Sequence, residues 1–256
     1  MSCLELNNLT IQTKNKILVD GVNFSIDKNE ILAIIGESGS GKTITALSIM
    51  GLLDKSTFSI KGSCIFNDTE LFTLKEEEHK KMMLEEISMI YQNPFTSLSP
   101  VEKIKTHIKN IYKIKNKKLC DKYLSNLFLS INLNMQETLN KYPHELSGGE
   151  LQRVMILFSV LFNPKVLICD EPTASLDYST GLQIVSLLDN LKNTTGMSIL
   201  FISHDISIVK KIADRIIIMN KGKILEEGTN EDIFNHPKNI YTEMLIKASM
   251  LERTHA

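Results

Sequence analysis

The sequence feature that most constrains this chain is the glycine-rich stretch GESGSGKT at residues 36–43. It matches G-x-x-x-x-G-K-[ST], the pattern of a phosphate-binding loop, at every fixed position. The apolar run at residues 31–35 predicts a buried parallel strand before it, and residues 44–53 predict a helix after it. Strand, loop and helix therefore follow the order that such a loop requires. The alternative is a glycine-rich turn that only joins a strand to a helix, and such a turn would not need the motif.

The residue types of this loop are suited to binding nucleotide phosphates. Its glycines let backbone amides turn toward a polyphosphate, and the helix N-terminus adds a positive potential. Lys42 can reach the β- and γ-phosphates, and the Thr43 hydroxyl can ligate magnesium. The predicted nucleotide contacts are Gly36, Glu37, Ser38, Gly39, Ser40, Gly41, Lys42 and Thr43.

The composition limits the size of the core and the classes of partner. With 256 residues, 43% of them hydrophobic, the chain can form one large core with an attached subdomain. A formal net charge of -1 provides no general attraction to nucleic acid, so we expect no nucleic-acid partner. The four cysteines are far apart, which favours reduced structural thiols over a metal or redox site. No apolar run reaches the ~20 residues that span a bilayer, so we expect a chain that cannot cross a membrane alone.

Hydrophobic patterns divide the chain into strands around the loop and a helical insertion. Residues 4–12 and 22–27 alternate apolar with polar side chains, which predicts an antiparallel flap before the core. Residues 60–67 and 87–91 predict further strands, and the charged residues 75–81 predict a solvated helix face.

The helical insertion is predicted from residue 101 to residue 139, where apolar residues recur at helical spacing. Between Glu102 and Lys122 it has eight lysines and two acidic residues, a local net charge of +6. A solvated helix face accounts for such a run, and a surface near anionic lipid headgroups is the alternative. The lysines are Lys103, Lys105, Lys109, Lys113, Lys115, Lys117, Lys118 and Lys122.

Two carboxylates follow a predicted strand after this insertion. Residues 166–169 are apolar and end at Asp170 and Glu171, at the sheet edge where ligands bind in open α/β folds. Asp170 can hold magnesium through a coordinated water, and Glu171 can deprotonate the water that attacks a γ-phosphoryl group. A salt-bridged strand end is the structural alternative. His204 follows the predicted strand 198–202, where a histidine is more often structural.

Taken in order, these motifs resemble those of the ATP-binding cassette (ABC) transporter ATPases over residues 4–245. The most specific match is LSGGELQR at residues 146–153, which P-loop kinases and GTPases lack. The resemblance implies an α/β fold, a P-loop NTPase core with a mixed, largely parallel sheet, an N-terminal antiparallel β-subdomain and an inserted α-helical subdomain. It implies one domain over residues 1–256, with the nucleotide-binding core at 1–92 and 163–256 and the helical subdomain at about 93–162.

The resemblance also implies a role for each motif. Ser147 and the amides of Gly148 and Gly149 would bind the nucleotide of an opposing cassette, so that two ATP molecules lie between two cassettes. Residues 36–43 would be Walker A. The other implied roles are Q-loop glutamine and magnesium sensor for Gln92, Walker B magnesium ligand for Asp170, catalytic base for Glu171, D-loop for Asp177 and γ-phosphate switch for His204.

The function implied by the resemblance is ATP hydrolysis, with ATP and Mg²⁺, in an importer. NPFTSL at residues 93–98, IFNHP at 233–237 and Tyr241-Thr242 look like the peptide and nickel importer branch, and the short end is more similar to its nickel or metal-chelate subunits. The implied partners are two permeases, a second cassette that is commonly a different chain, and an extracytoplasmic solute-binding protein. The implied place is the cytoplasmic face of the bacterial inner membrane. A soluble ABC ATPase of DNA repair or translation and a P-loop kinase are the competing interpretations.

One departure from the family pattern concerns the nucleotide base. The family usually stacks adenine on an aromatic residue of the first strands, and residues 7–19 contain none. Phe24 alternates with apolar neighbours and is assigned to the core. We expect adenine to pack on an aliphatic residue such as Ile11 or Ile17, with weaker base selectivity.

Overall fold

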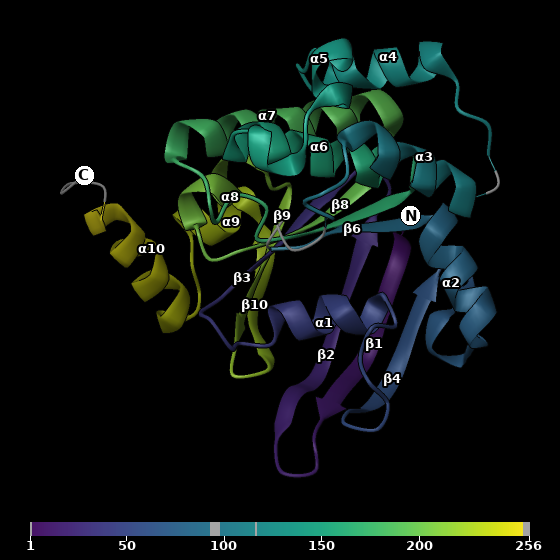
Figure 1. Cartoon of the computed structure of the whole chain (residues 1–256). Coiled ribbons are helices and arrows are strands. Elements are labelled where there is room, and N and C mark those ends of the chain that lie inside the picture. The colour runs from purple at the N-terminus through teal and green to yellow at the C-terminus, as the bar shows by residue number, and fades with distance from the viewer. Residues whose placement is uncertain (1, 93–97, 116, 253–256) are drawn as a thin grey trace.

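A computed structural model describes residues 2–92, 98–115 and 117–252 of the chain, which form two sheets and the helices that cover them (Figure 1). The strands of the central sheet are β3 (Ile31–Ile35), β6 (Ile87–Ile90), β7 (Val166–Asp170), β8 (Ser198–Ser203), β9 (Arg215–Asn220) and β10 (Lys223–Thr229). The strands of the antiparallel sheet are β1 (Ser2–Gln12), β2 (Ile17–Asp27), β4 (Ser59–Phe66) and β5 (Thr69–Glu70). The helices are α1 (Lys42–Ile49), α2 (Glu76–Glu85), α3 (Ile104–Ile114), α4 (Asp121–Ser130), α5 (Met135–Asn140), α6 (Gly148–Val160), α7 (Tyr178–Thr195), α8 (Ile206–Ile212), α9 (Asn230–Asn235) and α10 (Ile240–Glu252).

The central sheet has the strand order β10-β9-β3-β8-β7-β6. β3 pairs in parallel with β8 and β9, and β7 pairs in parallel with β6 and β8, whereas β10 joins the edge antiparallel to β9. Because neighbouring parallel strands end at the same edge of a sheet, the segments that follow β3, β7 and β8 lie close together. The predicted α/β fold, with its mixed sheet and its separate antiparallel β-subdomain, is confirmed.

β3 separates two hydrophobic cores. Ile31, Ala33 and Ile35 belong to the core shared with the insertion and with α7 and α8, whereas Leu32 and Ile34 belong to the core beneath the antiparallel sheet. Figure 1 shows the same layers, with α3–α7 above the central sheet and α1 and the antiparallel strands below it. A parallel strand covered on both faces needs apolar side chains throughout, which explains why residues 31–35 have no alternation.

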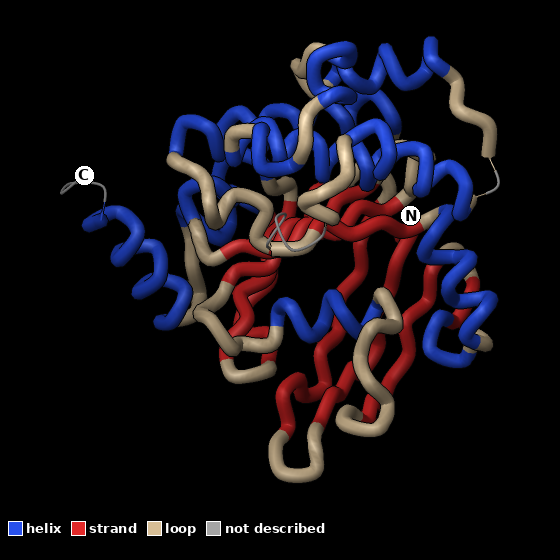
Figure 2. Tube along the Cα trace, viewed as in Figure 1, coloured by secondary structure: helices blue, strands red, loops and turns tan. Residues whose placement is uncertain are grey.

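The helices α3–α6 lie between β6 and β7 in the chain, as the helical spacing predicts, and Figure 2 shows this part as helices joined by loops. The domain boundaries given above stay a prediction. Residues 93–97, which form most of the NPFTSL motif, lie outside the described residues.

None of the described helices is both long enough and apolar enough to span a bilayer.

Two local features differ from the sequence prediction. α1 ends at Ile49 and not at residue 53, because Gly51 takes a left-handed conformation with φ of 64° and turns the chain out of the helix. β10 is a strand that the sequence did not predict. Its side chains are all exposed or half-buried, so an edge strand of this kind lacks the apolar face that would mark it in the sequence.

Candidate active site

The phosphate-binding loop is packed tightly between β3 and α1. Gly39 and Gly41 have φ of 80° and 108°, conformations that glycine adopts without the steric cost of a side chain. A Cβ atom at Gly36 would lie 2.1 Å from the carbonyl oxygen of Met219 in β9. The glycines at these positions therefore let the loop turn and approach the neighbouring backbone.

Lys42 is held inside this loop, with 4% of its surface exposed. Its ammonium group donates to the carbonyl oxygens of Gly36 at 2.7 Å and Glu37 at 2.9 Å. Burial lowers the pKa of Lys42, and the negative charges of Glu171 and Asp170 oppose that shift. The loop thus presents a desolvated cation, and its attraction for a phosphate is stronger here than in water because burial lowers the local dielectric constant.

Thr43 and Asp170 meet although they are far apart in the sequence. The Thr43 hydroxyl donates to Asp170 Oδ1 at 3.1 Å, because α1 begins beside the end of β7. Burial raises the pKa of Asp170, and the hydrogen bond from Thr43 partly offsets this. A hydroxyl and a carboxylate at hydrogen-bonding distance fit Mg²⁺, which usually takes one or two protein ligands and completes its shell with water and phosphate oxygens.

Glu171 connects three segments of the site. Its Oε2 accepts a hydrogen bond from Gln92 Nε2 at 3.0 Å, and its Oε1 lies 3.2 Å from His204 Nδ1. The residue has φ of 49°, in the left-handed region, and its N–H donates to the Ile202 carbonyl oxygen at 2.9 Å. The structure therefore brings the predicted Gln92, Glu171 and His204 together at the edge where β6, β7 and β8 end. The strained backbone at Glu171 has no signal in the sequence pattern.

Ser147 and Asp177 each cap the N-terminus of the helix that follows them. Ser147 Oγ accepts from the N–H of Glu150 at 3.2 Å, and the Glu150 carboxylate accepts from the N–H of Ser147, which makes a capping box at the start of α6. Asp177 caps α7, and hydrogen bonds from Ser179 and then Thr180 lower the pKa of its carboxyl.

The predicted residues 147–149 and 177 are not joined to the phosphate-binding loop by any hydrogen bond among the described residues. Ser147 and Gly148 are exposed, and Gly149 packs so closely against Thr180 that a Cβ atom there would lie 2.8 Å from it. The structure leaves the N-terminus of α6 open to a partner outside this chain's own loop.

The two aliphatic residues proposed for adenine differ in accessibility. Ile11 is completely buried, so that prediction is wrong: its side chain is part of the core beneath the antiparallel sheet. Ile17 is 52% exposed at the start of β2. The next residue, Leu18, has its carbonyl oxygen 3.0 Å from the position of a Cβ atom on Gly41. Ile17 therefore stays a candidate, exposed on a strand that packs against the loop.

Tyr241, near the start of α10, lies near the loop, and its position was not predicted. Burial raises the pKa of its phenol, and the negative charge of Glu37 raises it further. The phenol oxygen is buried, and no hydrogen bond with good geometry reaches it from the described residues. The sequence singled out Tyr241-Thr242 only as a family feature, because a contact across 204 residues of chain leaves no local pattern.

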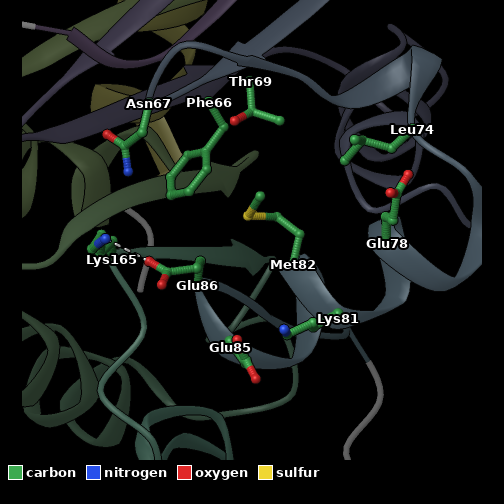
Figure 3. Close-up of a pocket in the computed structure, with 10 residues that line it drawn as sticks. All are labelled: Phe66, Asn67, Thr69, Leu74, Glu78, Lys81, Met82, Glu85, Glu86 and Lys165. Carbon is green, nitrogen blue, oxygen red and sulfur yellow. Dashed lines mark ion pairs between the residues drawn. The ribbon is translucent and has the colours of Figure 1, made fainter.

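A cavity of about 430 Å³ lies elsewhere, at the N-terminal ends of β6 and β7 (Figure 3). Figure 3 shows Phe66 and Met82 on its apolar side and the ion pair of Glu86 with Lys165, 2.8 Å apart, on another side. None of the predicted nucleotide contacts lines it. The candidate active site is therefore the opposite edge of the sheet, where the loop and the acidic side chains meet.

Comparison with known proteins shows the family to which the chain is similar. A family model described as ABC transporter matches residues 19–174. The oligopeptide transport ATP-binding protein AppD of Bacillus subtilis is 42% identical, over 95% of this chain and 77% of its own length. The metal-staphylopine import system ATP-binding protein CntD of Staphylococcus aureus is 35% identical, over 100% of this chain and 96% of its own length. The chain spans only 43% of a third relative, the peptidoglycan transport ATP-binding protein YejF of Agrobacterium fabrum, with 42% identity.

Solved structures show the same fold. CbiO1 from Clostridium perfringens, part of the transporter complex CbiONQ, superposes with a TM-score of 0.80 and 25% identity, over 100% of this chain and 99% of its own. The ATP-binding cassette MJ0796, in a dimeric post-hydrolysis state with ADP and phosphate, superposes with a TM-score of 0.76 and 25% identity, over 89% and 98% of the two chains. Because the family model matches more than half of the chain and both AppD and CntD are more than 30% identical to it, the chain belongs to the ABC transporter family and is an ATPase of that family.

Proposed function

We propose that this chain is the ATP-hydrolysing subunit of an importer for oligopeptides, nickel or a metal chelate, and that it works with two permeases at the cytoplasmic face of the cell membrane. The observation that carries its chemistry is the convergence of Gln92, Glu171 and His204 beside the buried ammonium group of Lys42. The names of AppD and CntD support a peptide or metal-chelate solute. These relatives favour transport over the alternative of a soluble repair or translation ATPase.

In this proposal Glu171 is the general base. Its carboxylate would take a proton from the water that attacks the γ-phosphoryl group, while Gln92 and His204 hold the carboxylate in place. Lys42 would bind the β- and γ-phosphates as a positive charge already stripped of water. Thr43 and Asp170 would hold Mg²⁺, which would neutralise part of the phosphate charge when it is bound.

The exposed N-terminus of α6 would complete a second cassette's site. Ser147, Gly148 and Gly149 present a helix N-terminus, which favours an anion, and Asp177 would lie at the same interface. A γ-phosphate held between two cassettes would close them, and its hydrolysis would let them open. A different chain is proposed as the second cassette, with a solute-binding protein delivering the solute to the permeases.

The test is to express the chain with its neighbouring permease and cassette genes, purify it in mild detergent and measure ATP hydrolysis with and without candidate solutes. We expect integral membrane proteins to co-purify and the solute-loaded binding protein to raise turnover. Lys42→Ala is the matched control, because it should still co-purify with the permeases but should not hydrolyse ATP. Failure to retain any integral membrane protein would contradict the transport proposal and leave only an ATPase.

A further inference from the structure

α3 presents a row of exposed lysines on the side that faces away from the core. Lys105, Lys109 and Lys113 are four residues apart, so they lie on one side of the helix, and all three are exposed. The opposite side of α3 is buried in the core formed with α6. Three more exposed lysines follow α3 in the chain, and the six together are called the lysine surface: Lys105, Lys109, Lys113, Lys117, Lys118 and Lys122.

Nearby carboxylates do not neutralise this surface. Among the described side chains, no acidic group forms an ion pair with any of the six lysines. Lys105 donates a hydrogen bond to the neutral amide oxygen of Asn140, at 3.2 Å. Burial lowers the pKa of the adjacent Lys115 to about 8, and the charge of Lys117 adds to that effect. The charge of Glu85 opposes that effect, so part of the positive charge is offset, but the stretch from Glu102 to Lys122 keeps a net charge of +6 while the whole chain has a net charge of -1.

The lysine surface also contains apolar side chains that the protein leaves in water. Ile114 is 66% exposed, and Leu119 and Tyr123 are 39% and 38% exposed. Ile114 ends α3 and Tyr123 lies in the first turn of α4, and Figure 1 shows the end of α3 and the start of α4 on the same side of the molecule. Exposed lysines interleaved with exposed aliphatic and tyrosine side chains are typical of segments that lie on a membrane surface.

The end of α3 is anchored to the rest of the protein. The N–H of Lys117 donates to the Tyr112 carbonyl oxygen at 3.1 Å, and the Tyr112 ring packs edge-on against Phe162 with centroids 4.9 Å apart. The ammonium groups of Lys115 and Lys117 lie 4.2 Å and 5.1 Å from the centroid of that same Phe162 ring. These contacts fix the segment to the residues just after α6, so its charges have a defined place on the surface.

We propose that the lysine surface is a binding site for the headgroups of anionic lipids, with Ile114, Leu119 and Tyr123 contacting the interfacial layer of the bilayer. Lysines on flexible stems match a fluid layer of headgroups, since each ammonium group attracts a negative charge without fixed geometry. The apolar residues add contacts that an acidic protein loop would not require. This inference does not rest on the transport proposal, because lipid binding needs neither nucleotide nor permease.

The test uses the full chain and vesicles of phosphatidylcholine alone or mixed in equal parts with phosphatidylglycerol. The chain should sediment with the anionic vesicles and not with the neutral ones, and added salt should weaken the binding. The triple variant Lys105→Glu, Lys109→Glu, Lys113→Glu should lower the partition coefficient about a hundredfold or more, since each lysine near an anionic surface contributes substantially.

The matched control reverses the same number of charges at exposed positions of other elements. Lys28→Glu, Lys61→Glu and Lys221→Glu together give the same net charge, and this variant should keep most of its vesicle binding. Circular dichroism and Mg-ATP binding of both triple variants should match those of the parent chain, which shows that they are folded. An equal loss in the two triple variants would overturn the proposal, because binding would then follow net charge and not this surface.

A second variant tests the apolar part of the surface. Leu119→Ser with Ile114→Ser should reduce partitioning to anionic vesicles at a salt concentration that screens the lysines. If the parent chain does not distinguish the two kinds of vesicle, the lipid proposal is wrong. A triple variant that loses only its binding to purified, lipid-free permease would instead identify the lysine surface as a site for an acidic protein segment.

Discussion

Glu171 is positioned by its backbone as well as by its side chain. A non-glycine residue with φ near 50° pays a conformational cost of about 1–3 kcal/mol, which the surrounding structure must offset. The hydrogen bond from the N–H of Glu171 to the carbonyl oxygen of Ile202 fixes that conformation. Gln92 and His204 then reach the carboxylate from two sides. Only 12% of the Glu171 side chain is exposed, so the carboxylate is held ready with little water around it.

Glu171→Gln should separate chemistry from binding. The amide keeps the size of the side chain but cannot accept a proton, so hydrolysis should fall about 10²- to 10⁴-fold while ATP still binds. The measurement is single-turnover hydrolysis together with nucleotide occupancy in the assembled complex. ATP should accumulate with closed cassettes, whereas Lys42→Ala should lose nucleotide binding. Hydrolysis at the parental rate in Glu171→Gln would show that another group is the base.

Asp170→Asn should stabilise the nucleotide-free chain at neutral pH while it abolishes Mg-ATP hydrolysis. Because burial raises the pKa of Asp170, its ionised form costs free energy of folding at every pH above its folded-state pKa. The gain from the amide should therefore be largest at neutral pH and disappear in acid, below the pKa of the unfolded chain. Thermal melting across pH tests this, with about 2–4 °C expected per 1 kcal/mol. A variant that melts lower at neutral pH would contradict it.

The C-terminal helix α10 is held by the edge strand β10. The Glu226 carboxylate accepts hydrogen bonds from the N–H groups of Lys238 and Asn239, at 2.7 Å and 3.1 Å, and from the Thr242 hydroxyl. Thr242 is fully buried, so the first turn of α10 is fixed even though Ile240 is exposed. This anchor holds the Tyr241 phenol near Glu37 at the start of the phosphate-binding loop.

Tyr241→Phe should change stability by no more than about 1 kcal/mol, because the phenol approaches Glu37 but makes no hydrogen bond of good geometry with the described residues. Tyr241→Ala should instead destabilise the fold, since it also removes the ring. Urea unfolding of the nucleotide-free chain tests both variants. If Tyr241→Phe is clearly destabilised, the phenol donates to Glu37 in solution.

The start of β2 should determine how well the chain distinguishes nucleotide bases. Without an aromatic platform, ATP and GTP should bind with similar affinities, and Ile17→Tyr should strengthen ATP binding by about 1–3 kcal/mol, the usual contribution of base stacking. Competition binding measures the ratio. Val101→Tyr, at a residue 80% exposed, is the control and should change neither affinity. A strong preference for ATP in the parent chain would show that another residue stacks on adenine.

At the scale of the whole molecule, the sequence predicts the phosphate-binding loop and the parallel strands because their signals are local. Residues 31–35 and 166–169 are continuous apolar runs, and strands covered on both faces need such runs. The sequence also predicts Gln92 and His204 as site residues. Only the packing of three strand ends shows that the side chains of both contact the carboxylate of Glu171.

Other features depend on contacts that no local pattern encodes. The left-handed backbone of Glu171 follows from its bond to the neighbouring strand, and the position of Tyr241 follows from the docking of α10. Ile11 was misassigned because an alternating strand shows which residues share a face, but not which face is covered. The partner contacts of Ser147 stay a prediction, since they require a second chain.

The isolated chain should bind Mg-ATP but hydrolyse it slowly. Ser147 and Asp177 are not bonded to the loop of their own chain, so half of each catalytic site is expected from another cassette. Adding the partner cassette and permeases should raise turnover, and Ser147→Arg should block that increase while this chain still binds ATP. Hydrolysis rates measured against oligomeric state test this. Full activity from a demonstrated monomer would contradict a shared site.

The burial of β3 on both faces has a mechanical consequence. Its five side chains are divided between the two cores, so the strand cannot shift without opening both of them at once. The phosphate-binding loop begins directly at its end and is therefore mounted on an immobile support. Any movement that ATP produces should therefore leave β3 and the start of the loop in place and displace the parts of the protein that pack around them.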